Sequence, residues 1–158
     1  MAKKTQYIHS QMLGQAGDPL ILPNTAVAEI INYVEPTAVK DAPDWMLGTL
    51  DWRGFRIPLL SLENAMGEAK AELTSDSRIA ILNCIGGRKT FNFYGILTTG
   101  LPRLINIEQK KIAAVPDTVK TRLVSCNVIV NDVEAIIPDL EEIESMVSKT
   151  GVRNSSAS

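Results

Sequence analysis

The apolar residues of this chain fall in short runs that glycine, proline and polar residues separate. This spacing is typical of β-strands joined by turns. Segments 45–52 and 55–60 flank the pair Arg53-Gly54 and predict a hairpin. Its corner uses Gly54, where a positive φ costs little. Pro58 lacks an amide donor, so we expect its strand to lie at a sheet edge or to bulge there.

Further strands are predicted by the same combination of apolar runs and turn residues. Adjacent runs joined by a short turn pair favour hairpins. The segments concerned are 27–34 as a single strand, 78–84 and 91–97 around Gly86-Gly87, and 124–130 and 133–137 around Asn131-Asp132.

Capping patterns predict two short helices. Ser61 can cap a helix over 62–66, which Gly67 can end. Asp139, with Glu142 three residues later, resembles a capping box at the start of the last helix. The residues expected on the apolar face of this last helix are Leu140, Ile143, Met146 and Val147.

These patterns together predict a mainly β fold. Short strands are expected to close into barrels, with a few short helices, and the sequence shows no alternation of strands with long helices. The polar segment 68–76 is expected to connect two lobes. The small and polar segment 151–158 is expected to be a disordered tail.

Composition and charge narrow the possible functions. The 158 residues are 45% apolar and 22% charged, with a net charge of −2. Because phosphate binding needs a concentrated excess of Lys and Arg, this charge argues against nucleic acid as a partner. The sequence contains no run of about 18 apolar residues and no secretory signal, so we expect no membrane insertion. We therefore predict a soluble, cytoplasmic protein.

The sequence offers few candidates for catalysis or metal binding. His9 is the only histidine, and one histidine cannot form the usual His-rich metal site. Cys84 and Cys126 lie in apolar runs and are expected to be buried thiols, although a disulfide between them stays open. Neither a phosphate-binding loop nor a nucleophile elbow occurs. We therefore predict no cofactor, no metal and no enzymatic activity.

The stretch 20–63 holds a series of short motifs. In order, these are a leucine-proline corner, a Val-x-Glu-Ile strand, an Ala-Pro turn and an Arg-Gly-x-x-x-Pro hairpin. The motifs stand at Leu22-Pro23, Val27 to Ile30, Ala42-Pro43 and Arg53 to Pro58. In kind, order and spacing they resemble the CheW-like family. In the second half, segment 94–97 resembles the Val-Gly-Leu-Val strand of that family, which an acidic residue usually follows. Here Thr98 or Thr99 stands in that place.

The resemblance implies two small five-stranded barrels packed side by side around a shared apolar seam, over residues 5–150. It also implies a non-enzymatic adaptor. Such an adaptor couples the cytoplasmic tip of a chemoreceptor, a methyl-accepting chemotaxis protein, to the regulatory domain of a CheA-type histidine kinase. The family positions associated with receptor coupling fall on Val27, Glu29, Arg53, Gly95 and Leu104.

Each of these five residues also has a purely structural interpretation. Val27 and Leu104 are either walls of a groove that holds a helical receptor tip or ordinary core residues. Gly95 is either a contact or a backbone necessity. Arg53 either orients a partner or forms a surface ion pair with Glu29, which would contribute less than ~1 kcal/mol.

Other functions remain open at this point. The same barrels can serve as a scaffold in a different signalling assembly. The hairpin with Trp45 and Trp52, together with Thr99, favours the divergent ChpC-like adaptors of type IV pilus systems, which act in twitching motility, over flagellar chemotaxis. Each tryptophan is either an interface anchor or part of the core.

An enzyme that uses carboxylates in a cleft between the lobes is a further alternative. It requires two acids that converge there, and Glu29 is the one plausible resident. The acids of the last helix, Glu141, Glu142 and Glu144, are expected to form a solvated face instead.

Overall fold

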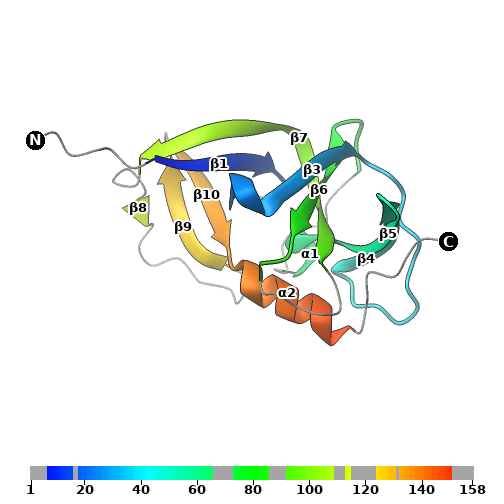
Figure 1. Cartoon of the computed structure of the whole chain (residues 1–158). Coiled ribbons are helices and arrows are strands. Elements are labelled where there is room, and N and C mark those ends of the chain that lie inside the picture. The colour runs from blue at the N-terminus through cyan, green and yellow to red at the C-terminus, as the bar shows by residue number, and fades with distance from the viewer. Residues whose placement is uncertain are drawn as a thin grey trace, which may run out of the picture.

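The computed structural model describes residues 7–15, 18–65, 73–85, 92–108, 113–114, 124–130 and 132–150. Strands dominate these residues, and the helices are short (Figure 1). The strands are β1 (Tyr7–Gly14), β2 (Leu20–Pro23), β3 (Val27–Asn32), β4 (Met46–Trp52), β5 (Phe55–Leu60), β6 (Ser77–Asn83), β7 (Phe93–Glu108), β8 (Ala113–Ala114), β9 (Val124–Val130) and β10 (Val133–Pro138). The helices are η1 (Asn24–Ala26), α1 (Leu62–Ala65) and α2 (Leu140–Lys149).

Strand β7 joins the two halves of the molecule. Its first part pairs with β6 and, through Leu59 and Leu60, with β5, whereas its second part pairs with β1. The hydrogen-bonded order is β3-β6-β7-β1-β2-β10-β9-β8, and β4 joins it through β5. We call β3–β6 with the first part of β7 lobe 1, and the remaining strands lobe 2. The mainly β prediction, with two small barrels and short helices, is confirmed, although the described ladder does not close on itself.

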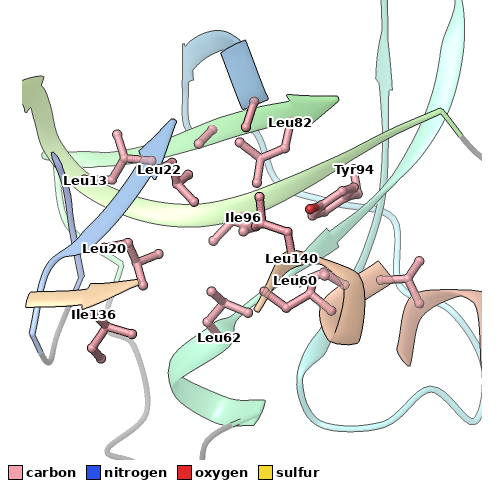
Figure 2. Close-up of a cluster of buried hydrophobic side chains, with 14 of the residues drawn as sticks. Leu13, Leu20, Leu22, Leu60, Leu62, Leu82, Tyr94, Ile96, Ile136 and Leu140 are labelled. Atoms are coloured by element: carbon pink, nitrogen blue, oxygen red, sulfur yellow. The ribbon is translucent and has the colours of Figure 1, made fainter. Parts of the chain in front are cut away.

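Three apolar clusters explain why the strands have this composition. Ile79 and Ile81 of β6 point into lobe 1, while the alternate residues Ala80 and Leu82 face the seam between the lobes. A strand that is buried on both faces needs apolar residues at successive positions. The seam cluster also takes in α2 (Figure 2). Its fully or nearly fully buried members include Leu13, Leu20, Leu22, Leu60, Leu62, Leu82, Tyr94, Ile96, Ile136 and Leu140.

The predicted hairpins are present. In the hairpin of β4 and β5, Trp52 pairs with Phe55, and the turn residues Arg53 and Gly54 have φ values of 47° and 81°. Positive φ at both positions is the mark of a type I′ turn, whose twist matches that of the strands. At Pro58, the described pairing of β5 is with β4 alone, so the missing amide donor needs no acceptor there.

The other sequence predictions have mixed outcomes. The strand predicted over 91–97 is part of a longer one, because β7 begins at Phe93 and continues to Glu108. Ser61 and Asp139 cap α1 and α2 as predicted, because their side chains accept from the amides of Asn64 and Glu142 at 3.3 and 3.1 Å. Several predicted features lie outside the described residues: Gly67, the Gly86-Gly87 turn, Asn131, the side chain of Cys126 and the tail 151–158.

Glu144 was expected on a solvated face of α2, and this prediction is wrong. Its side chain is 0% exposed, and its Oε2 accepts a hydrogen bond from the amide of Ile85 at 3.0 Å. Burial raises the pKa of Tyr94 well above its ordinary value, and the nearby Glu144 and Cys84 raise it further. Tyr94 therefore stays a neutral phenol at physiological pH. Glu144 ties α2 to the end of β6.

We expect Glu144→Ala to lower the free energy of unfolding by about 2 kcal/mol or more. The change leaves the Ile85 amide without its acceptor and opens a cavity beside α2. Glu144→Gln is the matched control, because it keeps an oxygen acceptor of the same shape. Urea denaturation measures both variants. Equal losses for alanine and glutamine would show that the hydrogen bond to Ile85 is not the cause.

Candidate functional site

Glu29 of β3 and the turn between β4 and β5 form a compact polar cluster on lobe 1. The Nε1 of Trp52 donates to Oε2 of Glu29 at 2.6 Å. Nη2 of Arg53 lies 3.8 Å from Oε1 of the same carboxylate. The guanidinium carbon of Arg53 also lies 4.8 Å from the centroid of the Trp52 ring. Each oxygen of Glu29 therefore faces a different donor, and the indole connects the two charged residues.

In this cluster the indole of Trp52 is buried and the guanidinium of Arg53 is exposed. Trp52 is buried, whereas the side chains of Glu29 and Arg53 are 38% and 65% exposed. An ion pair this exposed contributes less than ~1 kcal/mol to stability. The cation–π contact adds roughly 0.5–1 kcal/mol at such a site. The cluster therefore does little to stabilise the fold, but it fixes the direction in which the guanidinium points.

Arg53 occupies a backbone conformation that disfavours it. Its φ of 47° lies in the left-handed region, which glycine and asparagine occupy more readily and which costs other residues about 1 kcal/mol or more. Since Asn-Gly would suit this turn better, arginine is not there for the turn itself. An observed strain of this kind supports a functional role for the side chain.

Aromatic side chains extend the cluster into a partly exposed shelf. The Trp52 and Phe93 rings meet edge to face, with centroids 4.9 Å apart. Phe93 also contacts Phe55, whose ring centroid lies 5.9 Å away. Phe55 is exposed, so an apolar surface lies beside the Arg53 cation. Sequence analysis missed Phe55 and Phe93. The position of Phe55 directly after the turn was the available signal.

The other three predicted site residues differ in how far they are buried. Val27 is half-buried and packs against the seam cluster. Gly95 is buried in β7, where a Cβ would lie 3.0 Å from Cγ2 of Ile79. Gly95 is thus explained by close packing in the interior. Leu104 is 78% exposed, so it is not a core residue.

Strand register relates these residues to the cluster. Glu29 pairs with Ile81, which pairs with Gly95, so all three lie in one row across β3, β6 and β7. Leu104 pairs with Gln11 of β1, and Nε2 of Gln11 donates to Oδ1 of Asn24 at 2.8 Å. Asn24 begins η1, which leads into Val27.

The structure therefore brings Glu29 and Arg53 into direct contact. It links Leu104 to the start of β3 through the contact of Gln11 with Asn24, and it places Gly95 beneath the surface.

Sequence comparison agrees with this architecture. A family model for the CheW-like domain matches residues 12–147. The match spans both lobes and most of α2. The chain belongs to the CheW-like family.

Two individual proteins extend the comparison. The chemotaxis protein CheW of Helicobacter pylori is 28% identical over 97 residues, which cover 61% of this chain and 56% of that protein. The chain thus matches little more than half the length of this relative. The crystal structure of the scaffolding protein TtCheW from Thermoanaerobacter tengcongensis aligns with a TM-score of 0.73 and 23% identity, over 85% of this chain and 90% of that one. The second match shows that the two share a fold.

Thr98 and Thr99 stand where the resemblance set out above leads to the expectation of an acidic residue. Thr98, one of the two candidates for the place of the acidic residue, is buried in β7 and pairs with Arg78. Thr99 is half-buried and pairs with Ser77 and Gly14. Both threonines are held in the sheet between the lobes.

A cavity in lobe 1 can be compared with the carboxylate-based enzyme site considered above. It measures about 340 Å³, and its lining includes a single carboxylate, Glu35. Burial and the neighbouring Glu35 raise the pKa of Tyr33, which also lines the cavity. The described residues contain no group of three or more side chains suited to a metal ion, and none of their helices is long and apolar enough to cross a membrane.

Proposed function

We propose that this chain is a non-enzymatic cytoplasmic adaptor that couples the tip of a chemoreceptor to the regulatory domain of a CheA-type histidine kinase. The observation that carries the proposal is the arrangement of Arg53 over Trp52, with Glu29 beside both. Membership of the CheW-like family supports it. Because the matched relatives are described as a chemotaxis protein and a scaffolding protein, a role in assembling a signalling complex is the simplest one for this chain.

The exposed part of the cluster suits a helical receptor tip. A helix binds a β-lobed surface by placing apolar side chains on it while a few charges set its orientation. Phe55 and Phe93 offer the apolar surface, and Arg53 offers a planar donor that can bind a carboxylate or a carbonyl. The backbone of Arg53 and the Trp52 ring hold this guanidinium in place, so little side-chain entropy is lost on binding.

The choice of motility pathway does not follow from the tryptophans. Trp52 is buried in lobe 1, and Trp45 is half-buried against the seam cluster. Since both rings pack against apolar clusters of this chain, they do not favour a type IV pilus system over flagellar chemotaxis. We therefore propose a chemotaxis-type signalling role and do not propose a role in a type IV pilus system.

Reconstitution tests the coupling role. The chain is mixed with the CheA-type kinase and a receptor cytoplasmic fragment from the same organism, and the assembled complex is sedimented. We expect the kinase to sediment with the receptor fragment only when the chain is present, because the chain supplies contacts to both. Sedimentation of the kinase at the same level without the chain, or absence of the kinase with it, would refute the role.

A further inference from the structure

The cavity of lobe 1 lies where the chain crosses from β3 to β4. The last described pairing of β3 with β6 is at Asn32, and the chain next meets β4 in an isolated bridge between Thr37 and Thr49. Between these points Pro36 has no amide donor, so it cannot extend a ladder from one strand to the other. The cavity of about 340 Å³ opens beside this crossover, between it, β4, α1 and β7.

Apolar side chains line this cavity from its interior to its mouth. Leu97 of β7 is only 6% exposed, whereas Leu73 is 55% exposed and lies at the surface. Leu47 and Tyr33 are half-buried and also pack against the apolar interior of lobe 1. The volume falls within the range of small-molecule sites and is roughly twice the ~150 Å³ that holds a benzene molecule. A ring with a short side chain therefore fits.

The uncharged polar side chains near α1 already have structural partners. Oγ of Ser61 accepts from the amide of Asn64 at 3.3 Å, and Nδ2 of Asn64 donates to the carbonyl oxygen of Asp44 at 3.2 Å. These bonds cap α1 and tie it to the segment before β4. A ligand that carries a charge must therefore find its counter-charge elsewhere in the lining.

Glu35 supplies that charge. It is exposed, and it forms no ion pair with any residue that the structure describes. Among the described lining residues there is no lysine or arginine to neutralise it. The Tyr33 phenol lies beside Glu35: burial raises the pKa of Tyr33, and the carboxylate raises it further. Tyr33 therefore stays neutral at physiological pH, and its aromatic ring can attract a cation next to the carboxylate.

We propose that this cavity binds a small organic ammonium compound whose apolar body is a single ring with a short side chain. The ammonium group pairs with Glu35 beside Tyr33, and the body packs against Leu47 and Leu97. An anion of the same size would be repelled by Glu35, and a neutral molecule would gain only the apolar contacts. Neither Glu29 nor Arg53 belongs to the described lining, so this site is separate from the polar cluster of lobe 1.

An NMR titration of the whole isotope-labelled chain tests this inference. The probe is phenethylamine, which is a cation at neutral pH, and its matched controls are uncharged phenethyl alcohol and anionic phenylacetate. We expect phenethylamine to bind with a Kd of about 1 mM, which is ordinary for a ligand of about nine heavy atoms. The amide signals of Tyr33, Leu47 and Asn64 should shift. The alcohol should bind about tenfold more weakly, as for the loss of one charged contact, and phenylacetate should not bind.

Glu35→Gln isolates the contribution of the charge, because it keeps the size of the side chain. We expect it to bind phenethylamine about tenfold more weakly and phenethyl alcohol as the wild type does. Glu134→Gln, at an exposed acid of β10 outside the cavity, is the control and should bind both probes normally. Urea denaturation first establishes that both variants are folded.

Three results would overturn the ammonium site. These are equal affinity for the amine and the alcohol, unchanged amine affinity in Glu35→Gln, and no shift of the amides around the cavity at saturating amine. None of these measurements uses a receptor or a kinase, so each outcome leaves the proposed coupling role as it stands.

Discussion

Arg53→Glu is expected to weaken binding to the receptor fragment about tenfold or more while the chain remains folded. The substitution replaces the exposed donor with an acid beside Glu29, so a partner carboxylate or carbonyl meets repulsion instead of a hydrogen bond. The cost to stability is small, because an exposed ion pair and one cation–π contact are lost, together about 1–2 kcal/mol. Co-sedimentation with the receptor fragment and urea denaturation measure the two effects.

Arg53→Asn separates the role of the side chain from that of the turn. Asn-Gly is a preferred pair for a type I′ turn, so this variant relieves the strained backbone while it removes the guanidinium. We expect its free energy of unfolding to stay within about 1 kcal/mol of wild type, since the relief offsets the lost contacts. Its receptor binding should remain as weak as that of Arg53→Glu. Wild-type binding by Arg53→Asn would exclude Arg53 from the interface.

Local sequence signals predicted those parts of the fold that depend on a few neighbouring residues. The turn at Arg53-Gly54 and the cap at Asp139 follow from backbone conformation and from a side chain that reaches the next turn. The extent of β7 could not be predicted from such local signals, because Gly100 and Pro102 interrupt its apolar pattern. The register with β1 moves from Met12–Arg103 to Gly14–Thr99, so extra residues of β7 bulge at this point. Only the partner strand makes such a bulge compatible with one long strand.

The burial of Glu144 could have been found from the helix period. Leu140, Ile143, Glu144 and Val147 have the spacing of one helix face, and all four are buried. The prediction failed because a carboxylate was assumed to need solvent. The hydrogen bond that satisfies it comes from Ile85, 59 residues earlier in the chain. A buried polar group of this kind can be suspected from its position, but its partner depends on tertiary structure.

For the candidate site, too, the sequence indicated which residues matter but not which residues they contact. The family resemblance singled out Glu29 and Arg53, and the structure places them in contact. The resemblance did not indicate Trp52 as the link between them, since a tryptophan in a strand was expected to belong to the core or to an interface. A buried tryptophan usually finds an acceptor for its N–H. Here that acceptor is Glu29, 23 residues away, so the polar role of Trp52 became visible only in the fold.

Gly48→Ala is expected to cause the largest loss of stability, about 3 kcal/mol or more. Gly48 is buried in β4 with a φ of +145°, and a Cβ there would lie 2.3 Å from the carbonyl oxygen of Thr37. That carbonyl accepts from the Thr49 amide at 2.9 Å, and the Thr37 amide donates back to Thr49 at 2.7 Å. An added methyl group must push this bridge apart.

The bridge between Thr37 and Thr49 ties the segment that follows β3, the strand of Glu29, to β4, the strand of Trp52. Gly54→Ala is the matched control for Gly48→Ala. Its φ of +81° is also unfavourable for alanine, but no atom lies within 4 Å of its Cβ position. We expect Gly54→Ala to cost only about 1 kcal/mol, from the backbone alone. Urea denaturation compares the two. Because opening the bridge frees β4 from the neighbouring segment, receptor binding should fall with stability in Gly48→Ala. Equal stability losses in the two variants would show that close packing against Thr37 is not what requires glycine at position 48.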